Sequence, residues 1–216
     1  MKKKWIMLTS IIALILIVGV LAGPVMSNVE KPDYKVIQSE QNIEIRQYEP
    51  MIIAEVEVDG KREDAIRDGF RLLADYIFGN NTVQQVISMT APVQQKENQK
   101  IAMIAPVQQQ SMGKSWRMSF VMPSKYSMDS LPVPNNNRVR LKEILTKKFV
   151  VIEFSGTNSN ENVTEHENQL MNYIEANQIN IIGSPKYAFY NAPWTLPFLR
   201  RNEVMIEIKQ LKINYP

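Results

Sequence analysis

The residues with the clearest potential for chemistry lie in a repeated motif of this 216-residue chain. The nine residues 87–95 recur as residues 101–109, and seven of the nine positions are identical. Each copy carries one methionine, Met89 or Met103, followed closely by Ala-Pro-Val. Thioethers are soft and adaptable, so they either fill a core or line a site for a bulky apolar ligand. Both interpretations are open here, and a role in the core is the more common one.

The absence of cysteine and the presence of a single histidine exclude several kinds of site. The chain has no cysteine, which excludes disulfides, thiolate metal sites, a cysteine nucleophile and a lipid-modified cysteine. His166 is the only histidine, so no zinc site with two or more histidines exists. It shares a helical stripe with apolar residues, and a packed histidine is more common there than a metal ligand. The sequence therefore leaves the metal question open, and no iron ligand is identified.

Three carboxylates are candidates for acid–base chemistry. Glu55, Glu153 or Glu203, together with Tyr190, would form a hydrolytic set if burial raised the pKa of one carboxyl group. The alternative for Glu203 is a structural ion pair with Arg200 or Arg201. No catalytic residue is assigned on this pattern.

Arginines recur along residues 61–78, a segment with helical periodicity. Arg67 and Arg71 lie one turn apart, after Arg62, and such a pair suits the carboxylates of a bound ligand. The alternative is a solvated face, because acidic residues alternate with them: Glu63, Asp64, Asp68 and Asp75.

Strands and a helix are predicted for the first half. Alternation of apolar and polar residues predicts strands near 34–36, 43–45 and 51–58. In the last of these, Ile52, Ala54, Val56 and Val58 share one face, while Ile53, Glu55 and Glu57 share the other. A helix over 61–78 ends at Gly79-Asn80. Its spacing predicts that four residues face inward: Ile66, Phe70, Leu73 and Ile77.

A second round of elements follows. Strand-like runs occupy 86–93, 101–107, 116–122, 139–144, 149–154, 187–191 and 204–208, and the first two suggest a hairpin or edge strands. A helix is expected over 163–177, starting at the capping box Thr164-x-x-Glu167, with Leu170 and Ile174 inward. Few helices and many short strands predict an α+β domain with antiparallel strands. The two rounds suggest pseudo-duplicated halves.

The N-terminal 28 residues differ from the rest. Lys2, Lys3 and Lys4 precede an uncharged run from Trp5 to Gly23, which favours an uncleaved membrane anchor over a cleaved signal peptide. The body, 29–216, is then a single domain outside the cytoplasm, or is secreted or periplasmic if cleavage occurs. These three lysines account for the whole net charge of +3, because residues 29–216 contain 22 basic and 22 acidic residues. A balanced body predicts no nucleic-acid partner.

Several short motifs in order resemble the SOUL heme-binding family. They are Tyr34-x-Val36, Ile43-Glu44-Ile45-Arg46-x-Tyr48-Glu49-Pro50, Phe70-x-x-Leu73-x-x-Tyr76-Ile77-x-Gly79-x-Asn81, Met89-Thr90-Ala91-Pro92-Val93, Ser119-Phe120-x-Met122-Pro123 and Arg200-Arg201-Asn202-Glu203-Val204. The doubled Ala-Pro-Val is similar to the bacterial branch. The resemblance implies a distorted antiparallel β-barrel packed by two helices, with a hydrophobic groove for heme or another tetrapyrrole. It also implies distant similarity to bacterial effector-binding domains.

The resulting expectation is an exported or membrane-anchored protein that binds heme or a related tetrapyrrole weakly and without a covalent bond. The expected site lies against the first helix, with Arg67, Arg71, Met89 and Met103 as binding residues. Because no histidine precedes His166, iron would need a methionine or tyrosine ligand, or none. Two alternatives stay open: a small-molecule hydrolase of the effector-binding type, and a partner-binding protein without a small ligand.

Overall fold

The computed structural model describes residues 29–83 and 98–209. One antiparallel sheet of nine strands has the order β1-β2-β9-β11-β10-β5-β6-β3-β8. Its strands are β1 (Tyr34–Glu40), β2 (Ile43–Tyr48), β3 (Met51–Asp59), β5 (Val107–Ser111), β6 (Ser115–Val121), β8 (Arg140–Ile144), β9 (Lys147–Phe154), β10 (Ile181–Phe189) and β11 (Asn202–Ile208). A small pair, β4 (Asn81–Thr82) and β7 (Val133–Pro134), the helices α2 (Arg62–Ile77) and α3 (Asn160–Ala176), and the 3₁₀ turn η1 (Pro197–Leu199) complete the described elements. In this part of the chain, no helix has the length and apolar character needed to cross a bilayer.

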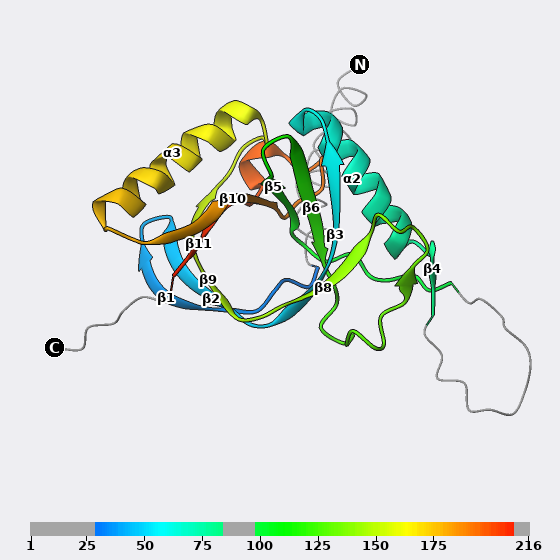
Figure 1. The fold of residues 1–216 in the computed structure, drawn as a ribbon. Coiled ribbons are helices and arrows are strands. Elements are labelled where there is room, and N and C mark those ends of the chain that lie inside the picture. The colour runs from blue at the N-terminus through cyan, green and yellow to red at the C-terminus, as the bar shows by residue number, and fades with distance from the viewer. Residues whose placement is uncertain (1–28, 84–97, 210–216) are drawn as a thin grey trace, which may run out of the picture.

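The nine-stranded sheet curls into a half-barrel, and both helices lie on its outer, convex face (Figure 1). Helix α2 packs on β3 and β6, and α3 packs on β9 and β11. Side chains alternate between the two faces of the sheet along each strand. One set packs into the cores beneath α2 and α3, and the other set points into the barrel. Ala54, Val56 and Val58 belong to the core under α2, as their period-two spacing predicts. The predicted class is confirmed: an α+β fold with a distorted antiparallel barrel and two packed helices.

Helix α2 matches its predicted span to within one residue at each end. Gly79 follows it with a φ of +123°, a conformation that glycine adopts without a Cβ penalty. The Asn80 N–H donates to the Asp75 carbonyl at 3.0 Å, which satisfies one of the last free carbonyls of the helix. Leu73 and Ile77 are buried as expected, and Ile66 packs partly buried against the same core.

Phe70 departs from the prediction, because its side chain is 38% exposed. The buried stripe of α2 is rotated towards Ala65, Gly69 and Leu73. Gly69 explains the rotation: a Cβ there would lie 2.6 Å from the Met118 sulfur, so only glycine allows the helix to approach β6 this closely. Phe70 therefore lies at the margin of the core under α2, where its ring packs edge-on against Phe120 with 5.4 Å between the ring centres.

We expect Phe70→Ala to lower the free energy of unfolding by about 1–2 kcal/mol, less than the roughly 3–5 kcal/mol of a fully buried phenylalanine. The reason is that part of the ring is already in water, and only its inner edge and the Phe120 contact are lost. Urea denaturation measures the change, with Arg71→Ala as a control on the exposed face of α2. A loss of 4 kcal/mol, about the full burial value, would contradict the marginal position of the ring.

Helix α3 begins three residues before the predicted start. Ser159 is its N-cap, and its hydroxyl accepts a hydrogen bond from the Asn162 N–H at 3.3 Å. The capping box proposed for Thr164 and Glu167 is therefore wrong, and Glu167 instead accepts a hydrogen bond from the Tyr187 hydroxyl at 2.7 Å. Leu170 and Ile174 are buried, as predicted.

The second copy of the repeated motif is not a strand from residue 101. Strand β5 begins only at Val107, after Pro106, which has no N–H to donate to a ladder. It then lies between β10 and β6 in the sheet, so the prediction of an edge strand or a hairpin partner is wrong for this copy. Ile101 and Ile104 are buried in the segment before β5. The predicted strand 86–93, with Met89, lies outside the described residues.

Candidate functional site

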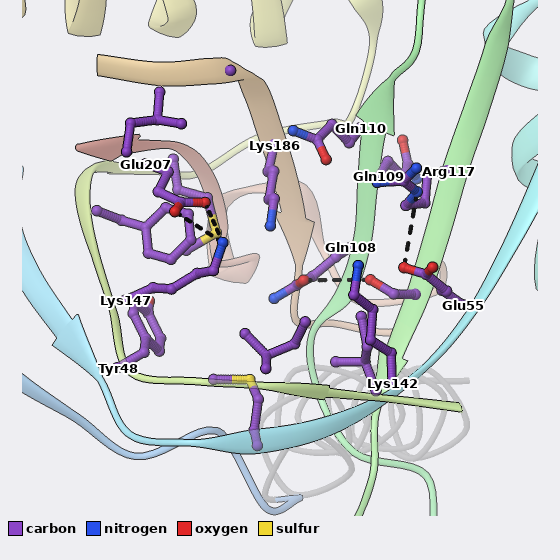
Figure 2. Close-up of a pocket in the computed structure, with 18 of the residues that line it drawn as sticks. Tyr48, Glu55, Gln108, Gln109, Gln110, Arg117, Lys142, Lys147, Lys186 and Glu207 are labelled. Atoms are coloured by element: carbon purple, nitrogen blue, oxygen red, sulfur yellow. Dashed lines mark hydrogen bonds and ion pairs between the residues drawn. The ribbon is translucent and has the colours of Figure 1, made fainter. Parts of the chain in front are cut away.

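The concave face of the sheet holds a cavity of about 210 Å³, which we call the groove (Figure 2). Cations and carboxylates project into it from several strands: Arg117, Lys142, Lys147, Lys186, Glu55 and Glu207. Uncharged polar side chains also line it: Gln108, Gln109, Gln110 and Ser119. Apolar and aromatic side chains complete the lining, including Tyr48, Met51, Ile53, Ile144, Phe149 and Met205. The groove is therefore amphipathic, with charges set around an apolar lining.

The strand registers bring these side chains together. Lys186 of β10 is opposite Gln110 of β5, which is opposite Arg117 of β6. On the other wall, Lys142 of β8 is opposite Ile53 of β3. Residues directly opposite in neighbouring strands point to the same face, so residues distant in sequence line one surface.

Positive charge is in excess in the groove. The Lys147 ammonium lies 2.7 and 2.8 Å from the two Glu207 oxygens, and Arg117 Nε lies 3.8 Å from a Glu55 oxygen. Both carboxylates of the lining thus face a cation (Figure 2). Lys142 and Lys186 make no ion pair with any of the described residues. The lining is left with two uncompensated cations.

Lys186 is the more enclosed of these two lysines. Its ammonium lies 5.2 Å from the centre of the Phe149 ring. Burial lowers the pKa of Lys186, and the neighbouring charge of Lys147 lowers it further. An anion in the groove would oppose both effects and stabilise the protonated lysine.

The opposite end of the barrel interior contains a buried ionic network. Glu203 is fully buried, and its carboxylate accepts hydrogen bonds from Arg46 at 2.8 Å, Arg201 at 2.6 Å and the Tyr190 hydroxyl at 2.7 Å. Arg46 is itself only 2% exposed. Although burial disfavours its charge, the adjacent Glu203 carboxylate raises the pKa of Arg46. Burial and Glu203 also raise the pKa of Tyr190. The network is thus charged and internally paired.

An apolar cluster separates the groove from this network. Tyr48, Phe149, Val151 and Met205 belong to one buried cluster, and the Tyr48 and Phe149 rings meet edge-on at 5.6 Å. Along β11 the order is Glu203 in the network, Met205 in the cluster and Glu207 in the groove. The barrel interior is consequently divided into two polar compartments by an apolar layer.

Of the four predicted binding residues, the three that the structure describes do not lie in the groove. Arg67 and Arg71 are 72% and 79% exposed on the outer surface of α2, where they pair with Asp64 at 2.8 Å and Asp68 at 3.7 Å. This is the solvated arrangement that was the alternative for these arginines. Met103 is 39% exposed and is not part of the groove lining, and Met89 lies outside the described residues.

The structure brings together part of the proposed hydrolytic set: the Tyr190 hydroxyl donates to Glu203 and Glu153 lies opposite Glu203, while Glu55 lies apart from them. Glu203 and Glu153 belong to the network, where Glu153 lies 3.1 Å from Arg201 Nε, whereas Glu55 lies in the groove beside Arg117. Of the two proposed partners of Glu203, Arg201 makes the ion pair. Arg200 instead donates to the carbonyls of Thr195 and Pro193. All three carboxylates are thus within 4 Å of a guanidinium.

His166 is a packed residue outside the groove. Its ring stacks on Phe154 at 4.0 Å, and its Nδ1 lies 2.8 Å from the Asn162 carbonyl oxygen. Within residues 29–83 and 98–209, no group of three or more histidine, aspartate or glutamate side chains is arranged to hold a metal ion. The groove lining includes the thioethers of Met51 and Met205 and the phenol of Tyr48, which are types of side chain that can ligate heme iron.

The fold and the groove define an α+β protein with a recess of about 210 Å³ in the concave face of a curled sheet. The model of the family described as SOUL heme-binding protein matches residues 29–207, and the chain belongs to this family. The recognition made from the short motifs is thereby confirmed.

Solved structures with a similar fold have little sequence in common with the chain. The C-terminal domain of EcmrR has a TM-score of 0.52 at 8% identity, covering 82% of this chain and 99% of that domain. A hydrolase from Listeria innocua has a TM-score of 0.51 at 12% identity, covering 80% and 94%. An uncharacterized conserved protein from Listeria innocua has a TM-score of 0.51 at 12% identity, covering 79% and 93%. No curated protein matches the sequence significantly.

Sequence reasoning missed the four cations of the groove. Arg117 and Lys142 lie on strands whose alternating pattern marks a polar face, and a polar face is normally taken as the solvent side. The signal that identifies them is their placement on the same side as Ile53 and Glu55, a face that mixes apolar and charged residues. The motifs that carry the family resemblance instead supply the network, through Arg46, Arg201 and Glu203.

Proposed function

We propose that this protein binds a tetrapyrrole reversibly in the groove, with the carboxylates of the ligand at Lys142 and Lys186. The observation that carries the proposal is the excess of two cations in a recess that also has an apolar and aromatic wall. A tetrapyrrole with acidic side chains has the complementary pattern, a flat apolar ring and anionic groups at its edge. Membership of the SOUL family supports this class of ligand.

The apolar lining supplies the contact area. Phe149 offers an aromatic ring, and Met51 and Met205 offer flexible side chains that adapt to a flat macrocycle. Charge-assisted hydrogen bonds to lysines then fix the orientation of the ligand. Lys186 must be protonated to make this bond, and the ligand carboxylate favours that form.

Iron is not required for this mode of binding. The single histidine stacks on Phe154 outside the groove, so recognition rests on the ring and its carboxylates. When heme is bound, iron adds only the coordination that a thioether or phenol provides. The ligand range therefore includes macrocycles without a metal.

The N-terminal sequence supports a location of this function outside the cytoplasm. Residues 1–28 carry three lysines followed by an apolar run, which supports a membrane anchor or, if it is cleaved, an export signal. The described domain begins directly after this segment. We propose that the groove samples ligands at the outer side of the membrane.

The deciding experiment compares heme with iron-free protoporphyrin, titrated into the full chain in detergent or vesicles. Soret absorption and porphyrin fluorescence follow the two ligands. We expect the dissociation constants to agree within about threefold, or roughly 0.7 kcal/mol. His166→Ala should leave both unchanged. A low-spin heme complex that disappears in His166→Ala would contradict the proposed site, and absence of binding by both ligands would refute the function.

A further inference from the structure

The connection between β10 and β11 presents apolar side chains to solvent. In residues 192–199, Trp194 is 66% exposed, Phe198 68% and Leu196 37%. Three large apolar side chains exposed within five residues form a patch, unlike the single exposed hydrophobic residues that are common on any protein.

This loop is held in one conformation. Thr195 at its centre is only 2% exposed, and the Arg200 side chain donates to the Thr195 carbonyl at 2.7 Å and to the Pro193 carbonyl. The Gly156 N–H donates to the Pro197 carbonyl at 2.9 Å, which ties the loop to the segment before α3. The exposed apolar side chains are therefore held in an outward position. The loop loses little further conformational entropy when these side chains contact a partner.

The loop lies at the end of the barrel where the described chain begins. The Tyr190 N–H donates to the Arg201 carbonyl at 3.2 Å and closes the base of the loop. Val29 packs against the buried cluster that contains Tyr190 and Ala105, and the Ala105 N–H donates to the Glu30 carbonyl at 3.2 Å. The apolar sequence 5–23 thus precedes a point close to the base of the loop.

We infer that the loop 192–199 inserts its apolar side chains into the interface of a lipid bilayer and forms a second membrane contact beside the N-terminal segment. Tryptophan favours the interface, where its ring is apolar and its N–H still reaches a polar partner. Phe198 and Leu196 extend the same surface. This inference rests on the anchoring proposed above, which brings the loop to the membrane.

The contact orients the domain. Along β10, the loop follows Phe189, whereas Gly183 and Lys186 of the groove lie towards the other end of the strand. With the loop in the bilayer, the open end of the groove faces away from the membrane. A soluble ligand then reaches the groove without crossing the lipid surface.

The absence of cysteine makes a clean test possible, because one introduced cysteine gives one label site. Nitroxide labels are placed on the full chain through Trp194→Cys, Phe198→Cys and, as a control, Met112→Cys. Met112 is 43% exposed in the turn between β5 and β6, at the opposite end of β5 from the loop. The chain is reconstituted into phosphatidylcholine and phosphatidylglycerol vesicles, and collision with oxygen and with a water-soluble nickel complex is measured by electron paramagnetic resonance.

We expect the loop labels to collide several-fold less often with nickel, and more often with oxygen, than the Met112 label. Equal nickel access at all three sites on vesicle-bound protein would overturn the loop contact and leave the anchor standing. Failure of the chain to float with vesicles would overturn both. Spin–spin broadening of the spectrum of the Phe198→Cys label in lipid-free detergent would identify a second copy of the chain as the partner of the loop. That result would also refute the inference. Unchanged thermal unfolding shows that the labelled variants are folded.

Discussion

Glu203→Ala should lower the free energy of unfolding by about 3–5 kcal/mol, the range for removing one member of a buried ion pair. Arg46 is 2% exposed and would lose its fully buried counterion at 2.8 Å, keeping only the partly exposed Glu44 at 2.6 Å and Glu153 at 3.8 Å. Arg201 and the Tyr190 hydroxyl would lose the same acceptor. Urea denaturation followed by circular dichroism measures the change, and Glu203→Gln provides a milder variant if the alanine protein does not accumulate.

Glu153 is the matched control for this prediction. It faces the same two arginines, at 3.8 Å from Arg46 and 3.1 Å from Arg201, but its side chain is 46% exposed. Water screens such a pair, so Glu153→Ala should cost at most about 1 kcal/mol. If the two alanine variants were equally stable, the network would not be the paired buried unit that its distances indicate.

Reversing the charge of the groove should abolish most ligand binding. In the double variant Lys142→Glu and Lys186→Glu, we expect the affinity for iron-free protoporphyrin to fall at least about 30-fold. Each lost charge-assisted hydrogen bond is worth roughly 1.5 kcal/mol, and the new carboxylates repel the ligand. Fluorescence titration at constant ionic strength measures the loss, and circular dichroism confirms that the variant is folded.

The helix offers a control with the same change in charge. Arg67→Glu combined with Arg71→Glu alters two exposed side chains on the outer surface of α2. If the ligand lies in the groove, this pair changes the affinity by less than about threefold, since exposed charges at a distance are screened. If the helix variant loses binding and the groove variant keeps it, the ligand lies against α2, as the arginine spacing first suggested.

The elements of the fold were largely predictable because strand and helix periodicity is local. The period-two run 51–58 and the helical stripe through Leu73 and Ile77 appear in the structure as expected. Phe70 was misplaced because hydrophobicity alone sets the predicted stripe, while the close approach at Gly69 sets the real one. The start of a strand was also misplaced. The apolar residues from Ile101 predicted a strand there, but β5 begins only at Val107, after Pro106.

The groove was not predictable in the same way. Lys142 and Lys186 are separated by 44 positions in sequence, and they line the same cavity only because the sheet curls. An alternating strand reveals that it has a polar face, but not whether that face meets water or the inside of a barrel. By contrast, the pairing of Glu203 with Arg201 involves residues two positions apart, and it was among the alternatives that the sequence offered.

The apolar layer of Tyr48, Phe149 and Met205 has a consequence for how such proteins diversify. This layer and the two cores beneath the helices contain most of the buried apolar side chains of the described residues. The charged side chains of the groove belong to none of these clusters, so substitutions can change the groove charges without removing a core side chain. A protein built on this scaffold can therefore change its ligand through substitutions at a handful of strand positions.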